Sequence, residues 1–385
     1  MSVVLFILLF FLMSSGILYA IMMLVFTFKW VSLPIYKNKG KNPETLITVI
    51  IPARNEEEHI AKCLQSILVQ NYPKNLTEII VVDDNSTDNT VRLVEKIITD
   101  NPDRKIRLMK LKDLSSTAFF KKRAITEAVA VATGKLIVTS DADCRMGVMW
   151  LSSIAEYYEL HKPKMLLGPV TFADEKSVFE KLQTLEFIGY IGVSAAAVAM
   201  KNPLMCNGAN LAYEREAFNE VGGYKHNDNL ASGDDVFLML KIKNMFPGAI
   251  HFLKSHEAIV QTFAQNNLND FFQQRKRWLS KRPGYTDYSV IGTALLVYAF
   301  NLFVLLGFVL SFFAEVNSFM ILFGLLFLLK CFSDFVFLYP VAKFFGRREL
   351  LWWFLPEQVL VIIYVTLMGI IGTNGKYSWK GRELK

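Results

Sequence analysis

The chain has 385 residues, of which 52% are hydrophobic and only 20% are charged, with a net charge of +7. This length allows one large domain with additions, or two domains. Such an apolar composition, with 31 phenylalanines, is unusual for a soluble enzyme, and the apolar excess is concentrated near the two ends. The four cysteines lie far apart with no CxxC spacing, which argues against a zinc site and a disulfide framework and suits a reducing compartment: Cys63, Cys144, Cys206 and Cys331.

The first apolar segment, residues 3–28, contains no charge and is long enough to cross a bilayer. It is too long for a cleaved signal peptide and has no basic n-region. We therefore expect residues 1–30 to form an uncleaved transmembrane anchor. Four lysines follow the segment, and positive charge at that point places the next domain in the cytoplasm: Lys29, Lys37, Lys39 and Lys41.

Residues 45–285 have the composition of a soluble domain in which strand and helix patterns alternate. In the first helix, Asn55 is expected to be the N-cap, and Glu56 suits the positive end of the helix, as do the two glutamates after it. The alternation predicts an α/β fold with a mainly parallel sheet wound right-handedly. The expected strands are residues 46–53, 77–84, 105–110 and 135–140, and the expected helices are residues 55–70, 87–100 and 121–133.

Acidic and polar residues follow three of these strands at the point where each strand ends. Residues 52–56 follow the first strand, Asp83 and Asp84 end the second, and Asp141 and Asp143 end the last. The last two are spaced i and i+2, so they share a face, and their repulsion is relieved by a cation. In parallel sheets, ligands bind beyond the carboxyl ends of the strands. Because the sequence contains no GxGxxG after the first strand and no GxxxxGK[ST], a nucleotide would be held there by carboxylates and a metal.

A second acidic pair, Asp234 and Asp235, precedes a segment with helical periodicity that extends to residue 244. The positive end of a helix would keep Asp235 ionised, as a general base requires. Simple capping of the helix is compatible with the same geometry.

Seven motifs together, in this order, resemble those of the family 2 glycosyltransferases, which have a GT-A fold. The motifs are IPARNEE, VVDDNSTD, the Lys121 region, SDADC, NGANLAYEREAFNEVGGY, SGDD and QRKRW, and they extend from about residue 48 to residue 278. The resemblance also covers the flanking membrane segments. It implies a sugar-nucleotide donor, a divalent metal (Mg²⁺ or Mn²⁺) and inversion at the anomeric carbon.

The resemblance also implies roles for single residues on the donor side. Lys121 would face the nucleotide, although Phe120 stands where the family usually has glycine and leaves the local loop geometry open. Asp141 would help to seat the nucleotide, and Asp143 would ligate the metal. The base and ribose would be held by Pro52, Ala53, Arg54, Asn55, Glu56 and Asp84.

On the acceptor side, Asp235 corresponds to the family's catalytic base, with Asp234 in place of the more usual glutamate. The family's QxxRW motif matches Gln274, Arg277 and Trp278. An arginine there holds diphosphate oxygens in a bidentate fork, and a tryptophan stacks on the acceptor. An alternative reading is a basic cluster that anionic lipid attracts beside the membrane, because the motif is joined by Arg275, Lys276, Lys281 and Arg282.

Residues 286–375 contain three further apolar segments, at about 290–313, 317–338 and 351–372, before a basic tail at 376–385. With the domain inside the cell, three more crossings would place that tail outside, although its charges favour the cytoplasm: Lys376, Lys380, Arg382 and Lys385. One segment is therefore expected to be re-entrant or interfacial, and 351–372 is the main candidate because Pro356 and Glu357 interrupt it. Residues 185–200 are read as an interfacial helix near the acceptor, with a plain buried helix as the alternative.

The sequence thus predicts a multi-pass membrane glycosyltransferase whose catalytic domain faces the cytoplasm, at the inner membrane in a bacterium. By resemblance, it would move a sugar from a UDP-sugar to a lipid-linked or membrane acceptor in envelope glycan synthesis, with no nucleic-acid partner. The alternatives are a processive polysaccharide synthase of the same family and a non-catalytic membrane scaffold. A transporter is excluded because the motif residues lie in the soluble domain.

Overall fold

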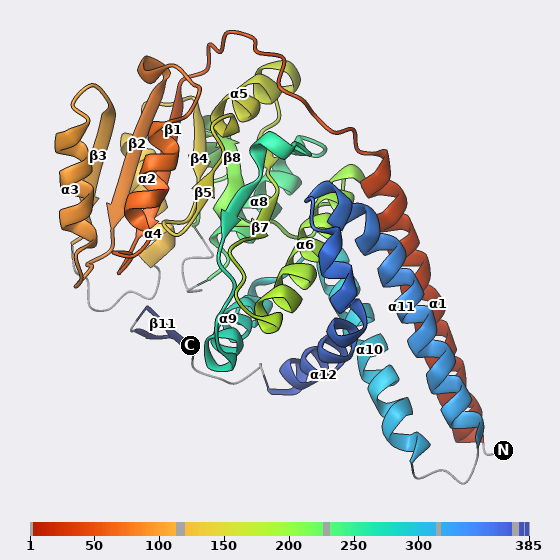
Figure 1. Cartoon of the computed structure of the whole chain (residues 1–385). Coiled ribbons are helices and arrows are strands. Elements are labelled where there is room, and N and C mark those ends of the chain that lie inside the picture. The colour runs from red at the N-terminus through yellow and green to blue at the C-terminus, as the bar shows by residue number, and fades with distance from the viewer. Residues whose placement is uncertain are drawn as a thin grey trace.

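The computed structural model describes residues 3–112, 120–225, 232–312, 317–371, 377–380 and 382–384. It combines an α/β domain with a group of long apolar helices (Figure 1). Lys376 and Lys385 of the predicted basic tail lie outside the described residues.

The centre of the α/β domain is a seven-stranded sheet in the order β3-β2-β1-β4-β8-β6-β9. The neighbours of β1, which are β2 and β4, run parallel to it, as β3 does to β2 and β9 to β6. Only β8 runs antiparallel to its neighbours, so the predicted mainly parallel sheet is confirmed. The strands are β1 (Ile47–Ala53), β2 (Thr77–Asp83), β3 (Lys105–Lys110), β4 (Leu136–Thr139), β6 (Met165–Leu167), β8 (Leu211–Glu214) and β9 (Ile250–Phe252).

A smaller sheet lies beside the end of β4 and joins three short strands in the order β5-β10-β7. Their bounds are β5 (Arg145–Met146), β10 (Val260–Thr262) and β7 (Val170–Phe172). Because β5 begins two residues after Asp143, this sheet places the end of β10 next to that carboxylate. Helices of the domain are α2 (Ile60–Leu68), α3 (Thr90–Asp100), α4 (Phe120–Val131), α5 (Trp150–His161), α7 (Arg215–Glu220), α8 (Asp234–Met245) and α9 (Leu268–Leu279).

The predicted start of the first helix of the α/β domain is wrong. Helix α2 begins at Ile60 with His59 as its N-cap residue, so Asn55 does not cap it and Glu56 lies before its first turn. Asn55 instead has a left-handed backbone, with φ of 51°, and its side-chain oxygen accepts a hydrogen bond from the Thr87 amide. Asparagine adopts this conformation more readily than most residues, so the chain turns here instead of entering the helix.

Five segments of the described chain are long and apolar enough to cross a membrane. One of them, α6, has 83% of its most apolar stretch buried, so the structure favours a buried helix for residues 185–200. It begins earlier than predicted, at Val178, where the Ser177 hydroxyl accepts a hydrogen bond from the Glu180 amide. The long helices are α1 (Val3–Ser32), α6 (Val178–Ala199), α10 (Tyr288–Ser311), α11 (Asn317–Phe344) and α12 (Phe354–Ile371).

Helices α1 and α11 lie side by side and extend away from the sheet together with α10, whereas α12 turns back toward α9 (Figure 1). The Tyr364 hydroxyl of α12 lies 2.8 Å from the Tyr190 hydroxyl of α6. Nine residues after the end of α12, the ammonium of Lys380 lies 2.8 Å from a carboxylate oxygen of Glu56. A chain of that length spans at most about 30 Å, so the end of α12 lies within that distance of Lys380.

A buried polar network joins α1, α11 and α12. The Lys330 ammonium donates to Asp334 at 2.6 Å and to the Gln358 side-chain oxygen at 2.5 Å. The Tyr19 hydroxyl donates to the other oxygen of Asp334 at 2.6 Å. All of these side chains are buried, and each charge has a partner, as ionisable groups among apolar helices require.

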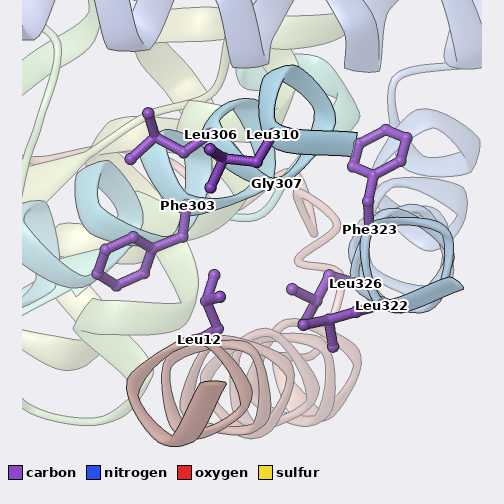
Figure 2. Close-up of a pocket in the computed structure, with 8 residues that line it drawn as sticks. All are labelled: Leu12, Phe303, Leu306, Gly307, Leu310, Leu322, Phe323 and Leu326. Carbon is purple, nitrogen blue, oxygen red and sulfur yellow. The ribbon is translucent and has the colours of Figure 1, made fainter. Parts of the chain in front are cut away.

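Farther from the sheet, α1, α10 and α11 leave an apolar crevice between them (Figure 2). Leu12 of α1 points into it, Phe303 of α10 and Phe323 of α11 also line it, and its other lining residues are leucines and a glycine. This apolar lining is suited to contact with hydrocarbon, and it contains no polar side chain that could take part in a reaction.

Candidate active site

Lys121, in the first turn of α4, links two of the predicted acidic clusters. Its ammonium lies 2.5 Å from Asp141 Oδ1, just beyond β4, and 3.6 Å from Asp234 Oδ2, at the start of α8. Burial alone would lower the pKa of Lys121, but these carboxylates raise it well above its ordinary value. The carboxyl end of β4 and the N-terminus of α8 therefore meet around one permanently charged lysine.

Asp143 follows Asp141 by two residues and is half-buried. Burial, followed by the charge of Asp141, raises the pKa of its carboxyl group, whereas Lys380 and the Thr262 side chain act in the opposite direction. A half-buried carboxylate beside a second one fits the oxygen ligands that Mg²⁺ and Mn²⁺ take in proteins. Within the described residues, no group of three or more histidine, cysteine, aspartate or glutamate side chains could hold a metal alone. The residues present thus fit a metal whose remaining ligands come from a bound molecule.

The residues predicted to hold a base and ribose converge at the ends of β1 and β2. Pro52 and Ala53 are the last residues of β1, and the Asp84 amide donates to the Ala53 carbonyl at 2.9 Å. The Arg54 guanidinium donates to the backbone carbonyls of Asp84, at 2.5 Å, and Asn85, at 3.0 Å. Arg54 therefore ties the two strand ends together.

Lys380, in the turn of a C-terminal hairpin formed by β11 (Tyr377–Trp379) and β12 (Arg382–Leu384), also reaches this edge of the sheet. Its ammonium pairs with Glu56, and its carbonyl accepts a hydrogen bond from Arg54 at 3.3 Å. Burial raises the pKa of Glu56 to about 7, although Lys380 lowers it in part. No sequence pattern predicted a role at this site for Lys380, which stood out only as a member of the basic tail.

Asp235 lies in the first turn of α8, as predicted, and both of its oxygens have partners. Oδ2 accepts from the Gly208 amide at 3.2 Å, whereas Oδ1 accepts from the Val236 amide at 2.8 Å and the Lys281 ammonium at 3.2 Å. Burial would raise the pKa of Asp235, but Lys281 and Lys121 lower it below the ordinary value. This carboxylate is therefore ionised at neutral pH.

Gly208 lies close to Lys121 and to both aspartates at the start of α8. A Cβ placed on it would lie 3.5 Å from Lys121 Nζ, 3.5 Å from Asp234 Oδ2 and 3.6 Å from Asp235 Cβ. The glycine of the NGAN motif therefore lies where the β4 side and the α8 side approach each other.

The QxxRW residues lie on α9, which packs against α6. The Trp278 ring lies edge-on to Tyr190 at 6.2 Å, and the Arg275 guanidinium lies 4.2 Å above its centre. Gln274 accepts a hydrogen bond from Arg275 at 3.0 Å. Of the described contacts, none joins Gln274 or Trp278 directly to the carboxylates, and Arg277 is half-buried.

Two residues assigned to a lipid-attracting basic cluster have other partners. Arg275 is buried and pairs with Glu186 of α6, and Lys281 is only 13% exposed and pairs with Asp235. The lipid interpretation is therefore wrong for these two residues, since their charges face carboxylates inside the protein. Sequence patterns missed this because both pairs join residues distant in the chain.

Two family patterns match the chain. The one described as Glycosyl transferase family 2 matches residues 48–222, and the one described as Glycosyl transferase family group 2 matches residues 136–368, more than half of the chain. Glycosyltransferase AglE of Haloferax volcanii is 32% identical over 198 residues, which are 49% of this chain and 59% of that protein. Poly-beta-1,6-N-acetyl-D-glucosamine synthase of Staphylococcus epidermidis is 24% identical over 239 residues, 60% of this chain and 53% of that protein. The chain spans less than two thirds of the length of these curated relatives.

The fold is similar to that of a solved mannosyltransferase, PcManGT from Pyrobaculum calidifontis in complex with GDP-Man and Mn²⁺. The match covers 93% of this chain and 97% of that one, with a TM-score of 0.58 and 19% identity. It confirms the predicted GT-A fold. Since the family pattern extends over more than half of the sequence, this chain belongs to the family 2 glycosyltransferases.

Proposed function

We propose that this protein is a membrane-bound inverting enzyme that transfers a sugar from a nucleoside-diphosphate donor to a hydroxyl group of a lipid-linked or membrane acceptor. The observation that carries the proposal is the meeting of two acidic groups from separate elements. Asp141 and Asp143 follow β4, Asp234 and Asp235 begin α8, and Lys121 contacts one member of each pair. The site thus has one pair for the donor and another for the acceptor.

On the donor side, the ends of β1 and β2 would hold the base and ribose, and Lys121 and Asp141 would orient the nucleotide. Asp143 would be the protein ligand of Mg²⁺ or Mn²⁺, and Lys380 would lie near the diphosphate because its charge also acts on Asp143. When bound, the metal would supply positive charge that stabilises the departing diphosphate. The complex of PcManGT with GDP-Man and Mn²⁺ supports metal use in this fold. A UDP-sugar is the expected donor from the family resemblance alone.

On the acceptor side, Asp235 would take the proton of the attacking hydroxyl. The acceptor oxygen then bonds to the anomeric carbon from the face opposite the diphosphate, whose bond to that carbon breaks, and the configuration inverts. Oδ2 is the oxygen available for this proton, because it has a single backbone partner whereas Oδ1 has two partners. Trp278 would provide an apolar surface for the acceptor, and Gln274 and Arg277 would lie beside it.

We place α1, α10 and α11 across the membrane and α12 at the membrane surface. Three crossings leave the tail on the same side as the α/β domain, in agreement with the contact between Lys380 and Glu56. This arrangement removes the conflict that four crossings would create. The lysines after α1 then place the domain in the cytoplasm.

A processive synthase remains the second candidate, because one relative is named as a poly-beta-1,6-N-acetyl-D-glucosamine synthase. With three crossings, the chain offers few helices for a polymer channel. Product length on a gel separates these candidates, since single transfer gives one discrete product and a synthase gives a ladder or a polymer.

The proposal is tested by calorimetry of the full chain in detergent against UDP, GDP and CDP, each with and without Mn²⁺. We expect metal-dependent binding of one nucleotide, and Asp143→Ala should remove most of the metal dependence because it removes the metal's protein ligand. Asp103→Ala is the control, since Asp103 forms an exposed ion pair with Lys74. Unchanged Mn²⁺ dependence in Asp143→Ala would refute the metal assignment, and binding of no nucleotide would refute the donor site.

A further inference from the structure

The ammonium of Lys281 is the only side-chain cation within hydrogen-bond distance of Asp235 among the described contacts. Lys281 follows α9 by two residues and reaches across to the start of α8, where both side chains of the pair are 13% exposed. A Cβ on Gly233, just before α8, would lie 3.4 Å from Lys281 Cδ, so the stem of the lysine packs against the backbone there. The Lys281 side chain is therefore held by the backbone at Gly233 and by Asp235, and little of the pair is open to solvent.

The two carboxylate oxygens of Asp235 have different numbers of partners, and this difference matters for proton transfer. Lys281 and the Val236 amide both bind Oδ1, which leaves Oδ2 with only the Gly208 amide. A cation on one oxygen holds the plane of the carboxylate and directs the free lone pair of the other oxygen. A contact with Oδ2 instead would compete with the acceptor for the proton-accepting position.

We propose that Lys281 is a positioning residue for the transfer reaction, which holds Asp235 by Oδ1 so that Oδ2 receives the proton of the acceptor hydroxyl. This inference rests on the proposed role of Asp235 as the base. The acceptor O–H bond breaks and its proton goes to Asp235. The acceptor oxygen bonds to the anomeric carbon, and the electron pair of the bond between the sugar and the diphosphate leaves with the diphosphate. Lys281 keeps its proton throughout, because it acts through Asp235 and does not touch the reacting atoms.

The charges around Asp235 give the proposal a pH signature. Lys281 and Lys121 lower the pKa of Asp235, and its other ionisable neighbours are Asp234, Cys206, Tyr224 and Tyr285. The cysteine and tyrosines have raised pKa values because they are buried, so they stay neutral near pH 7. Removing the charge of Lys281 therefore leaves Lys121 as the cation that keeps Asp235 ionised.

The test compares the pH dependence of kcat/KM in the wild type, Lys281→Met and Lys281→Arg. An opposite charge within a few ångströms shifts a carboxyl pKa by about 1 to 3 units, so Lys281→Met should move the acidic limb upward by about one unit. It should also lower kcat about tenfold or more with little change in donor KM, because the base is less well oriented. Lys281→Arg should restore the acidic limb.

The matched control is Arg282→Met, which removes an exposed charge from the next position and should leave the profile unchanged. Thermal unfolding of each variant in detergent shows whether it is folded. A folded Lys281→Met protein with a wild-type acidic limb and wild-type kcat would overturn the inference. Failure of the proposed function is distinguished by Asp235→Asn, because full activity in that variant would refute the base itself whatever Lys281 does.

Discussion

Lysine ion pairs occur both inside the helical group and at the edge of the sheet, and the two regions use them differently. In the helical group, buried Lys330 donates hydrogen bonds to Asp334 and Gln358, both also buried, so the charges of Lys330 and Asp334 are matched within the protein. At the sheet edge, Lys121 and Lys380 come from distant parts of the chain. Lys121 pairs with Asp141, which is 39% exposed, and Lys380, which is about one third exposed, pairs with buried Glu56. In the first region the ion pairs join helices to one another. In the second, under the proposed function, they would keep acidic groups ready for a charged ligand.

The largest effect is expected from Asp235→Asn, which removes the proposed base. The amide cannot accept the acceptor proton, and loss of a general base lowers rates by about 10² to 10⁴-fold. We expect kcat for sugar transfer to fall by that factor while calorimetry shows nearly unchanged nucleotide binding. Asp100→Asn, at the exposed end of α3, is the control. Transfer at the wild-type rate by Asp235→Asn would show that another group is the base.

Inside the helical group, Lys330→Met should affect stability and not the chemistry. The substitution leaves Asp334 buried without its cation, and breaking a buried ion pair from one side costs about 3 to 5 kcal/mol. Thermal unfolding in detergent should show a clearly lower midpoint, whereas Lys343→Met, an exposed position on the same helix, should not. A wild-type midpoint for Lys330→Met would mean that the network contributes little to packing.

The smallest effect is expected from Lys380→Ala, which sharpens the comparison at the sheet edge. Because Lys380 is about one third exposed, we expect affinity for the nucleotide with Mn²⁺ to fall only about threefold to tenfold. Calorimetry measures this change, with Lys62→Ala on the exposed face of α2 as the control. Tighter nucleotide binding by the variant would show that Lys380 obstructs the donor site.

The sequence predicted the features that depend on local patterns. Continuous apolar runs indicated β1 and β2, and the carboxylates after β4 were predicted to share an edge with the ends of those strands. The predicted cap at Asn55 failed because a backbone turn and a hydrogen bond from Thr87 outweighed the residue's preference for helix starts. A local preference decides structure only where no tertiary contact competes with it.

The partners of Lys281 and Lys380 lie 46 and 324 residues away in the chain, and no periodicity links such positions. Both lysines belong to basic clusters beside apolar segments, and that composition is also typical of contacts with lipid headgroups. One sequence therefore shows that positive charge is present there but not which carboxylate it faces. The antiparallel β8 was missed for a similar reason, because strand direction depends on the path of the chain between strands.

The junction between α1 and the α/β domain has a further consequence. The Lys254 ammonium donates to the carbonyls of Trp30, at 2.6 Å, and Leu33, at 3.0 Å, and lies 4.2 Å above the centre of the Trp30 ring. These contacts hold the end of α1 against the α/β domain. If α1 crosses the bilayer as proposed, these contacts keep Asp235 at a fixed height above the membrane. Activity on acceptors with spacers of graded length between lipid and hydroxyl would then have a sharp optimum, and the spacer length at that optimum would report the height.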